Sequence, residues 1–339
     1  MVAREIIRSN LFGSSSVTRV TGEPVALFGT TVRALRYTPE RILSVYSYDE
    51  TTGAKVYFGS DDFTAGASGI ARTVASSIYD FDNYAITMTG GTYELVTSDP
   101  RNPPIVMYRL VYVDYDTAFQ EPTLIPALAP SPLSGHIVTA GDSITGGAHT
   151  VSRENFDSDA DGYVGIIRNH FRNVFDVTNF SFNGSSIGQL TTGLPAILAG
   201  GPSALTVAFG QNDHVAGLGA PLVSFEDALT DIVDDAQAAG VYVVLLGFMP
   251  KNPLWENYNA TSAAAYNQAI ADVATATGAA FVDIEAAWAA VRADKTHMEL
   301  TGDNHHHPNN YGSRLYASAL LPFLNSQTIY TNELPWFVG

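Results

Sequence analysis

Apolar and polar positions follow one pattern in the first 120 residues and a different pattern after residue 135. The first part holds short runs of apolar, aromatic and β-branched residues, separated by turn residues and with few stretches of helical spacing. Gly90-Gly91 between two threonine-containing runs predicts a hairpin. Residues 1–120 are therefore predicted to form a small β-rich domain, with strands at 24–28, 42–47, 54–58, 84–88 and 105–113.

From residue 136 the pattern changes to alternating apolar strands and amphipathic helices. This alternation predicts a parallel sheet that is covered by helices on both faces. Ser224 with Asp227 is predicted to cap one helix, and Gly240 and Gly278 are predicted to end two helices. Strands are expected at 136–140, 175–181, 204–209, 241–247 and 280–283, and helices at 162–173, 224–239, 259–277 and 310–323.

Between the two patterns lies a segment with four prolines, residues 121–135. Proline-rich sequence of weak periodicity is typical of a semi-rigid connector. We therefore predict a β-rich domain at 1–120, a linker at 121–135 and an α/β hydrolytic domain at 136–339.

Composition and charge exclude several classes of protein. The chain has 339 residues and a net charge of -17, which disfavours nucleic-acid phosphates and acidic membrane surfaces as partners. No apolar run is long enough to span a bilayer, and the first residues lack an apolar signal core. The absence of cysteine excludes disulfides and thiol catalysis. The chain is expected to be soluble; secreted and cytoplasmic locations both stay open, as does the oligomeric state.

Four polar blocks follow predicted strands or precede the last helix, at 141–144, 179–186, 210–213 and 301–309. In an open parallel sheet such blocks meet along one edge, where ligands normally bind. A serine there can act as nucleophile, with a histidine as base and a carboxylate behind it. The N–H groups of Ser143 and Gly184 and the Asn212 amide could stabilise an oxyanion. The blocks therefore predict acyl transfer.

These blocks resemble those of the SGNH hydrolases, the GDSL-like esterase superfamily. Ser143, Gly184, Asn212 and His307 stand in the family's order, over about residues 136–324. The resemblance implies a flavodoxin-like three-layer α/β/α sandwich and ester hydrolysis that requires no cofactor. Residues 44–63 with 70–78 also resemble the β-rich extension of some bacterial members.

The histidine block departs from the commonest family pattern, in which the acid precedes the histidine by three residues. Here Asp303 precedes His307 by four, so Asp303 could orient His307 across a longer turn. Asp303 and His306 could instead pair at the usual spacing, or a backbone carbonyl could stand behind His307. We predict a Ser143–His307–Asp303 triad.

Two segments raise the question of a metal. His305, His306 and His307 are consecutive, and neighbours on an extended chain point to opposite sides, so no metal site is expected there. Residues 157–162 resemble the start of a calcium loop, although its twelfth position is Arg168. The alternative is an acidic loop that caps the next helix. Any calcium would be structural, with Asp157, Asp159 and Asp161 as ligands.

The predicted function is a serine esterase for short acyl esters, particularly acetyl groups on carbohydrate. Predicted substrate contacts are Asp142, His214, Trp255 and Tyr258, although Trp255 and Tyr258 could equally close their own loop. The partner would be a small-molecule or carbohydrate ester. The alternatives are a lipase, lysophospholipase or thioesterase of the same superfamily, and a carbohydrate-binding protein that has lost catalysis.

Overall fold

The computed structural model forms two compact units, and each is described by itself. The described residues are 18–48, 54–78, 80, 84–89, 92–97, 110–118, 135–148, 162–171, 175–215, 217, 219–253, 259–293, 295–303 and 306–324. The predicted linker at 121–135 lies outside them except for Gly135, so it stays a prediction.

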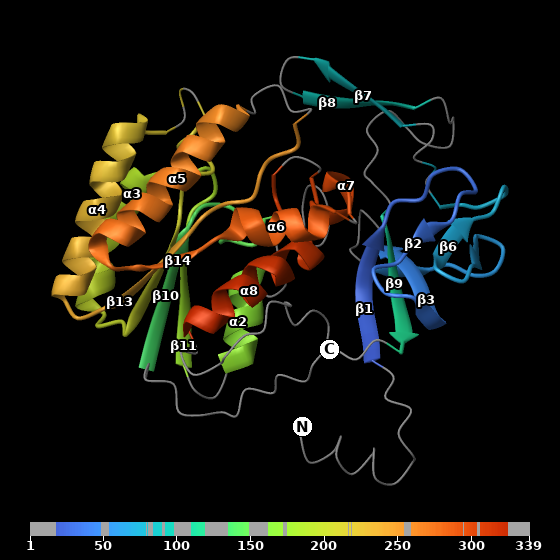
Figure 1. Ribbon diagram of the computed structural model, residues 1–339, viewed down its shortest axis with the longest axis horizontal. Coiled ribbons are helices and arrows are strands. Elements are labelled where there is room, and N and C mark those ends of the chain that lie inside the picture. The colour runs from blue at the N-terminus through green and yellow to red at the C-terminus, as the bar shows by residue number, and fades with distance from the viewer. Residues whose placement is uncertain are drawn as a thin grey trace, which may run out of the picture. The chain divides into compact units, whose positions relative to one another are not determined.

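The amino-terminal unit is built from antiparallel strands (Figure 1). One sheet has the order β1-β9-β3-β4, from β1 (Thr18–Val25), β9 (Val111–Thr117), β3 (Pro39–Tyr48) and β4 (Lys55–Tyr57). A second sheet has the order β2-β6-β5, from β2 (Arg33–Ala34), β6 (Gly69–Arg72) and β5 (Phe63–Ala65). The predicted β-rich region is therefore confirmed, with three more strands than the pattern indicated and with β9 running on to Thr117.

A two-stranded sheet flanks the diglycine of the predicted hairpin. It joins β7 (Tyr84–Thr89) to β8 (Thr92–Thr97).

In the larger sheet, Val45 and Val113 point into a core that also buries Glu23. The Glu23 carboxylate accepts hydrogen bonds from the Tyr115 hydroxyl (2.7 Å) and the Arg36 N–H (2.8 Å), which satisfies its buried oxygens.

The second unit is a parallel sheet of order β11-β10-β12-β13-β14. Its strands are β10 (Gly135–Gly141), β11 (Phe175–Ser181), β12 (Ala204–Ala208), β13 (Tyr242–Leu246) and β14 (Ala280–Val282). In order of sequence this is 2-1-3-4-5, the flavodoxin-like arrangement. The predicted fold class is therefore confirmed, and all five predicted strands form, each within one residue of its expected bounds.

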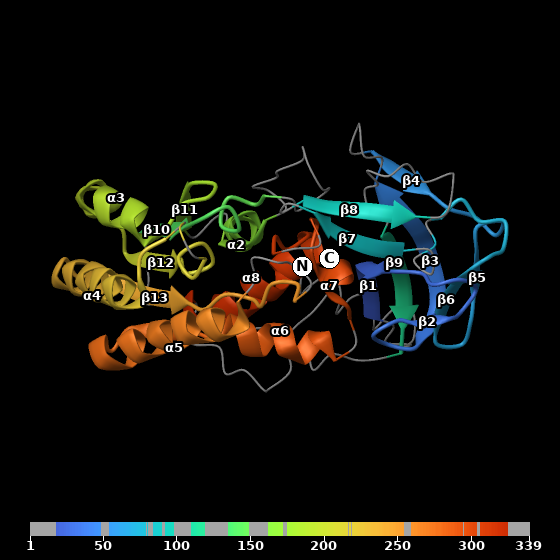
Figure 2. The same ribbon diagram turned by 90° about the horizontal axis from the view of Figure 1, so that it is seen from above.

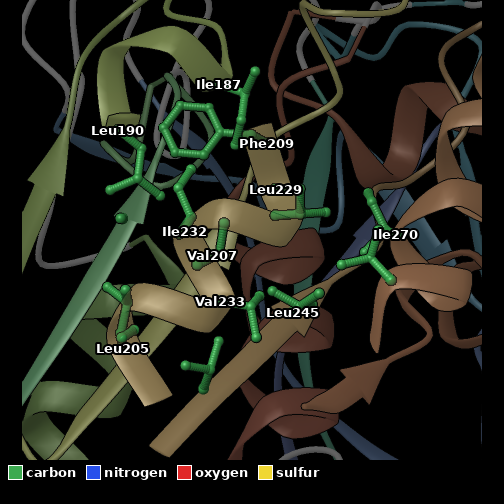
Figure 3. Close-up of a cluster of buried hydrophobic side chains, with 14 of the residues drawn as sticks. Ile187, Leu190, Leu205, Val207, Phe209, Leu229, Ile232, Val233, Leu245 and Ile270 are labelled. Atoms are coloured by element: carbon green, nitrogen blue, oxygen red, sulfur yellow. The ribbon is translucent and has the colours of Figure 1, made fainter. Parts of the chain in front are cut away.

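Helices cover both faces of this sheet (Figures 1 and 2). One layer holds α3 (Ile187–Ala199), α4 (Leu222–Ala238) and α5 (Ala260–Thr277). The other holds α2 (Tyr163–Phe171) and α8 (Asn310–Leu324), with α6 (Ile284–Arg292) packed on α8; the short α7 (His297–Leu300) precedes the histidine block. Leu205, Leu229 and Leu245 belong to the apolar cluster between sheet and first layer (Figure 3).

One helix prediction needs correction, and three helices were missed. Helix α4 begins at Leu222, and no side chain caps it, so Ser224 lies inside the helix. Pro221 fixes φ at -54° and its carbonyl accepts the Phe225 N–H, which starts the helix earlier than the Ser-Asp pattern indicates. Gly278 does end α5, with φ +73°. Helices α3, α6 and α7 were not predicted.

Candidate active site

The candidate nucleophile lies on a tight turn at the carboxyl end of β10. Gly141 is required there, because a Cβ at this position would lie 2.8 Å from the Ala208 carbonyl oxygen of the neighbouring strand. The Asp142 side chain accepts the Ile144 N–H (2.9 Å), and the Ser143 carbonyl accepts the Ala148 N–H (3.0 Å). These bonds fix the backbone of Ser143, whose side chain is almost buried. The turn lies at the point where the strand order reverses, between β11 and β12, which is where ligands bind in this fold.

A continuous hydrogen-bonded chain joins three of the predicted residues. Ser143 Oγ lies 2.8 Å from His307 Nε2, and His307 Nδ1 lies 2.6 Å from Asp303 Oδ2. The other nitrogen-to-acid contact, from His306 Nδ1 to Asp303 Oδ2, is 3.7 Å and therefore too long for a hydrogen bond. The sequence left open which histidine pairs with Asp303. In the structure the hydrogen bond joins Asp303 to His307, four residues later.

The loop that carries His307 explains this spacing. Thr301 and Pro308 form an antiparallel bridge, closed by hydrogen bonds from Gly302 N–H to His307 O (2.9 Å) and from Asn309 N–H to Leu300 O (3.0 Å). Inside the loop, Asp303 Oδ1 accepts the backbone N–H groups of His306 and His307, both at 3.1 Å. One carboxylate oxygen therefore shapes the turn and the other faces the imidazole of His307.

The loop also brings the His306 and His307 rings together, with centroids 4.0 Å apart and planes tilted by 39°. The expectation that consecutive histidines point to opposite sides is wrong for this pair, because the chain here is a closed turn rather than an extended strand. His305 and Asn304 lie outside the described residues.

The candidate oxyanion donors come from three loops that are tied together. Gly184 has φ +73°, a conformation that favours glycine. Within the described part of the chain, neither its N–H nor that of Ser143 donates a hydrogen bond, so both are available to a ligand. The third donor, Asn212 Nδ2, contacts the Ser185 carbonyl (2.9 Å), the residue after Gly184. The Phe182 N–H in turn donates to Gly141 O (3.2 Å) and links this loop to the nucleophile turn.

Asp213 organises the same region and was not singled out from the sequence. Its two oxygens accept the Ile187 N–H at the start of α3 (3.0 Å) and the Gly210 N–H (3.1 Å). A carboxylate at a helix start is favourable electrostatically. Burial nevertheless raises the pKa of Asp213. Its position directly after Asn212 was the signal that could have found it.

Two buried ionisable groups, Asp142 and Lys251, interact electrostatically with each other and with the proposed triad. Burial raises the pKa of Asp142 to about 6, against smaller opposing effects of its hydrogen bond and of His307. Burial also lowers the pKa of Lys251 to about 7, although Asp142 and Asp303 favour its charged form. Lys251 is almost completely buried in the loop after β13 and was missed, because nothing in Pro250-Lys251-Asn252 indicates burial.

Two predicted substrate contacts are buried, and two lie outside the described residues. The His214 ring stacks on Phe248, with centroids 5.6 Å apart, and burial lowers its pKa to about 4. Asp142 is only 2% exposed and holds the nucleophile turn. Trp255 and Tyr258 lie outside the described residues, so all four assignments stay predictions.

The predicted calcium ligands Asp157, Asp159 and Asp161 also lie outside the described residues, so this prediction too is left standing. Over the part of the chain that is described, no helix combines the length and the apolar character needed to cross a membrane.

Comparisons with known proteins concern the family and the fold of the chain. The model of the GDSL-like Lipase/Acylhydrolase family matches residues 139–315. No curated protein matches the chain. A catalytic mutant of Axe2, an acetylxylan esterase from Geobacillus stearothermophilus, is 19% identical, with a TM-score of 0.50 over 60% of this chain and 98% of that one.

Two further structures are similar in part. LAE5, an alpha/beta hydrolase enzyme from the metagenome of Lake Arreo, Spain, is 20% identical over 57% of this chain and 96% of its own, with a TM-score of 0.49. TesA is also 20% identical, over 57% of this chain and 99% of its own, with a TM-score of 0.47. At such identities a structural likeness concerns the fold alone. Because the family model covers more than half of the residues, the chain belongs to the GDSL-like lipase/acylhydrolase family and is a carboxylic ester hydrolase.

Proposed function

We propose that this protein is a serine esterase that removes short acyl groups, in particular O-acetyl groups of carbohydrates. Ser143 is the nucleophile, His307 the general base and acid, and Asp303 the group that orients His307. The observation that carries the proposal is the chain of hydrogen bonds from Ser143 Oγ to His307 Nε2 (2.8 Å) and from His307 Nδ1 to Asp303 Oδ2 (2.6 Å). Nucleophile, base and orienting acid in this contact are what acyl transfer requires.

In the acylation step, Ser143 Oγ attacks the ester carbonyl carbon while His307 Nε2 takes the hydroxyl proton. Asp303 stabilises the imidazolium that forms and keeps its Nδ1–H directed away from the serine. The tetrahedral intermediate then collapses: the carbon–oxygen bond to the alcohol breaks, and His307 gives its proton to the leaving oxygen. Water repeats the sequence on the acyl-enzyme, which releases the acid and restores Ser143.

The negative oxygen of each intermediate is proposed to bind to the N–H groups of Ser143 and Gly184 and to Asn212 Nδ2. The free backbone N–H groups support this role, since they need not break an internal bond. Asn212 would exchange or share its bond to the Ser185 carbonyl. Preorganised donors of this kind are typically worth about 10² to 10³ in turnover each.

The preference for acetyl groups on sugars is supported by less. It rests on the chemistry of the family and on the additional β-rich unit, since the acetylxylan esterase named above shares only the fold, at 19% identity. A lipase, lysophospholipase or thioesterase activity remains the alternative within the same family. The length of the acyl chain that is hydrolysed fastest distinguishes these.

The first experiment measures release of p-nitrophenol from acetyl through decanoyl esters. We expect kcat/KM to fall with chain length, and Ser143→Ala to lower kcat by about 10⁴-fold or more. Ser203→Ala is the matched control, because Ser203 Oγ donates to the His136 carbonyl (2.9 Å) at the opposite end of the sheet. Faster hydrolysis of long chains would instead favour a lipase-type activity.

A serine-directed fluorophosphonate gives an independent test. It should label the wild type and Ser203→Ala but leave Ser143→Ala unlabelled. A wild type that neither reacts with the probe nor hydrolyses any ester, yet binds acetylated xylan, would overturn the catalytic proposal in favour of a carbohydrate-binding protein.

A further inference from the structure

The histidine loop offers a metal-ion donor set in addition to the proposed triad. One ligand atom from each of Asp303, His306 and His307 lies within 4.8 Å of the others. Asp303 Oδ2 is 2.6 Å from His307 Nδ1 and 3.7 Å from His306 Nδ1. The same carboxylate oxygen therefore faces two imidazole nitrogens from one turn.

This donor set suits Zn²⁺. Two imidazoles and a carboxylate are common zinc ligands, at about 2.0 to 2.2 Å from the ion, and a fourth position is then left for water. Tetrahedral geometry at such distances separates the ligand atoms by about 3.3 Å. The two measured separations, 2.6 and 3.7 Å, lie on either side of this value, and all three ligand atoms lie within 4.8 Å of one another, so local side-chain rearrangement would admit the ion.

The loop holds the donors ready. Asp303 Oδ1 is fixed by the two backbone N–H groups of His306 and His307, which leaves Oδ2 directed at the rings. The bridge between Thr301 and Pro308 closes the loop at its base. The three side chains are each 10 to 15% exposed, so an ion can reach them from solvent. The turn therefore orients Asp303 and both backbone positions of the histidines before any ion binds, which lowers the entropic cost of binding.

We propose that Asp303, His306 and His307 bind Zn²⁺ and that the bound ion switches off the esterase. The inhibition rests on the proposed function, whereas the binding does not. In the active state His307 carries its proton on Nδ1 and accepts the serine proton on Nε2. Coordination uses the Nδ1 lone pair, so the single proton of the neutral ring resides on Nε2. Nε2 then donates to Ser143 Oγ and can no longer act as its base.

His306 is the residue that separates metal binding from catalysis. Its imidazole supplies a zinc ligand and packs on the His307 ring, with Nδ1 3.7 Å from Asp303 Oδ2, whereas its backbone N–H donates to Asp303 Oδ1. His306→Asn keeps that N–H and removes the imidazole. His136→Asn is the matched control, because His136 lies at the opposite end of β10, where it contacts Thr178.

The test is Zn²⁺ titration of the EDTA-treated full-length enzyme, with p-nitrophenyl acetate as substrate. We expect inhibition of the wild type and of His136→Asn that EDTA reverses. His306→Asn, compared with its own activity without zinc, should need at least about tenfold more zinc for half inhibition, as loss of one ligand would cause. Equal inhibition of His306→Asn and wild type would overturn the proposal, as would no inhibition of an active enzyme.

Binding is measured separately by calorimetry on Ser143→Ala, which keeps all three ligands. One Zn²⁺ per chain, weakened by His306→Asn in the same background, supports the site even if no ester substrate is found. Absence of that binding event would reject the site whatever the esterase assays give. Failure of the zinc proposal and failure of the esterase proposal are thereby distinguishable.

Discussion

The strands of the parallel sheet are apolar along their middles and polar just beyond their carboxyl ends. Leu205 and Leu245 lie in the cluster under α4 and α5, with almost no exposed area. Asp142, Asp213 and Lys251 are equally buried in the loops that follow the same strands. Burial of the leucines stabilises the fold. Burial of the two acids raises their pKa and burial of the lysine lowers its pKa, so in each case the neutral form is favoured.

This difference separates two kinds of buried residue. Burial of the apolar cluster stabilises the folded state. Burial of ionisable groups in the loops near Ser143 has a desolvation cost, which lowers the net stability. Substitutions of the proposed catalytic groups in the loops should therefore change activity more than stability, and substitutions in the cluster should do the reverse. The following predictions test that division.

The largest effect is expected from Asp303→Asn. The amide retains an oxygen for the backbone N–H groups of His306 and His307 but can present an NH₂ group to His307 Nδ1. The ring is then held in the wrong tautomer, and kcat should fall by about 10³ to 10⁴. Steady-state kinetics and urea unfolding measured together should give a large loss of turnover with little loss of stability. A loss under tenfold would instead favour a backbone carbonyl as the partner of His307.

Leu229→Ala should have the opposite character. Leu229 is 2% exposed on α4, and its truncation leaves a cavity that typically costs about 2 to 5 kcal/mol of unfolding free energy. The kcat of the folded enzyme should stay within about twofold, because α4 contacts α3, α5 and β13 and carries none of the proposed catalytic groups.

Val223→Ala on the same helix is the control for this variant. Val223 is 67% exposed, so its truncation should change stability by less than about 0.5 kcal/mol. A cluster variant that stays folded but loses turnover as strongly as Asp303→Asn would contradict the division between core and loops.

Asn212→Ala sharpens the role of a single loop donor. We expect kcat to fall by about 10² to 10³ while KM changes little, because the amide is proposed to act on the developing oxyanion. Its bond to Ser185 O is also lost, so thermal unfolding should be recorded beside the kinetics. A rise in KM alone would assign the amide to ground-state binding of the substrate.

How far the sequence predicts the fold follows from the same division. The apolar runs of β12 and β13 are strong local signals, and their predicted bounds agree with the structure within a residue. Helix α3 was missed because Gly188, Gly193 and Pro195 disfavour a helix. Gly193 is needed at its position, since a Cβ there would meet the Phe180 ring. That constraint comes from tertiary packing and leaves no signal in local propensity.

At the site, the order of the polar blocks and the resemblance to the SGNH hydrolases led to the prediction of Ser143, Gly184, Asn212 and His307, and these assignments stay predictions. The sequence left three possible partners for the histidine block open, because the distance from Asp303 to His307 depends on the closed turn between Thr301 and Pro308. Nothing local distinguishes a lysine that is buried from one on the surface, so Lys251 could not have been found. Sequence spacing locates residues on elements, and the pairing of loops decides which of them touch.

The smallest effect is expected from Asp142→Asn, and its sign depends on pH. Burial raises the pKa of Asp142 from 3.8 to about 6, so the folded state binds this proton more tightly than the unfolded chain. The stabilising contribution is complete below pH 3.8 and is lost as the pH rises through about 6. The amide is never ionised and still accepts the Ile144 N–H. Asp142→Asn should therefore be more stable than the wild type at pH 8, by at most roughly 3 kcal/mol.

Urea unfolding at pH 5 and pH 8 measures this, with Asp227→Asn on the exposed face of α4 as the control. The gain from Asp142→Asn should shrink at pH 5, and the control should show no such change. Equal effects at both pH values would mean that burial does not shift the pKa of Asp142, and would contradict this prediction. A gain in stability that is larger at pH 8 than at pH 5 would show that ionised Asp142, beside the nucleophile, destabilises the fold.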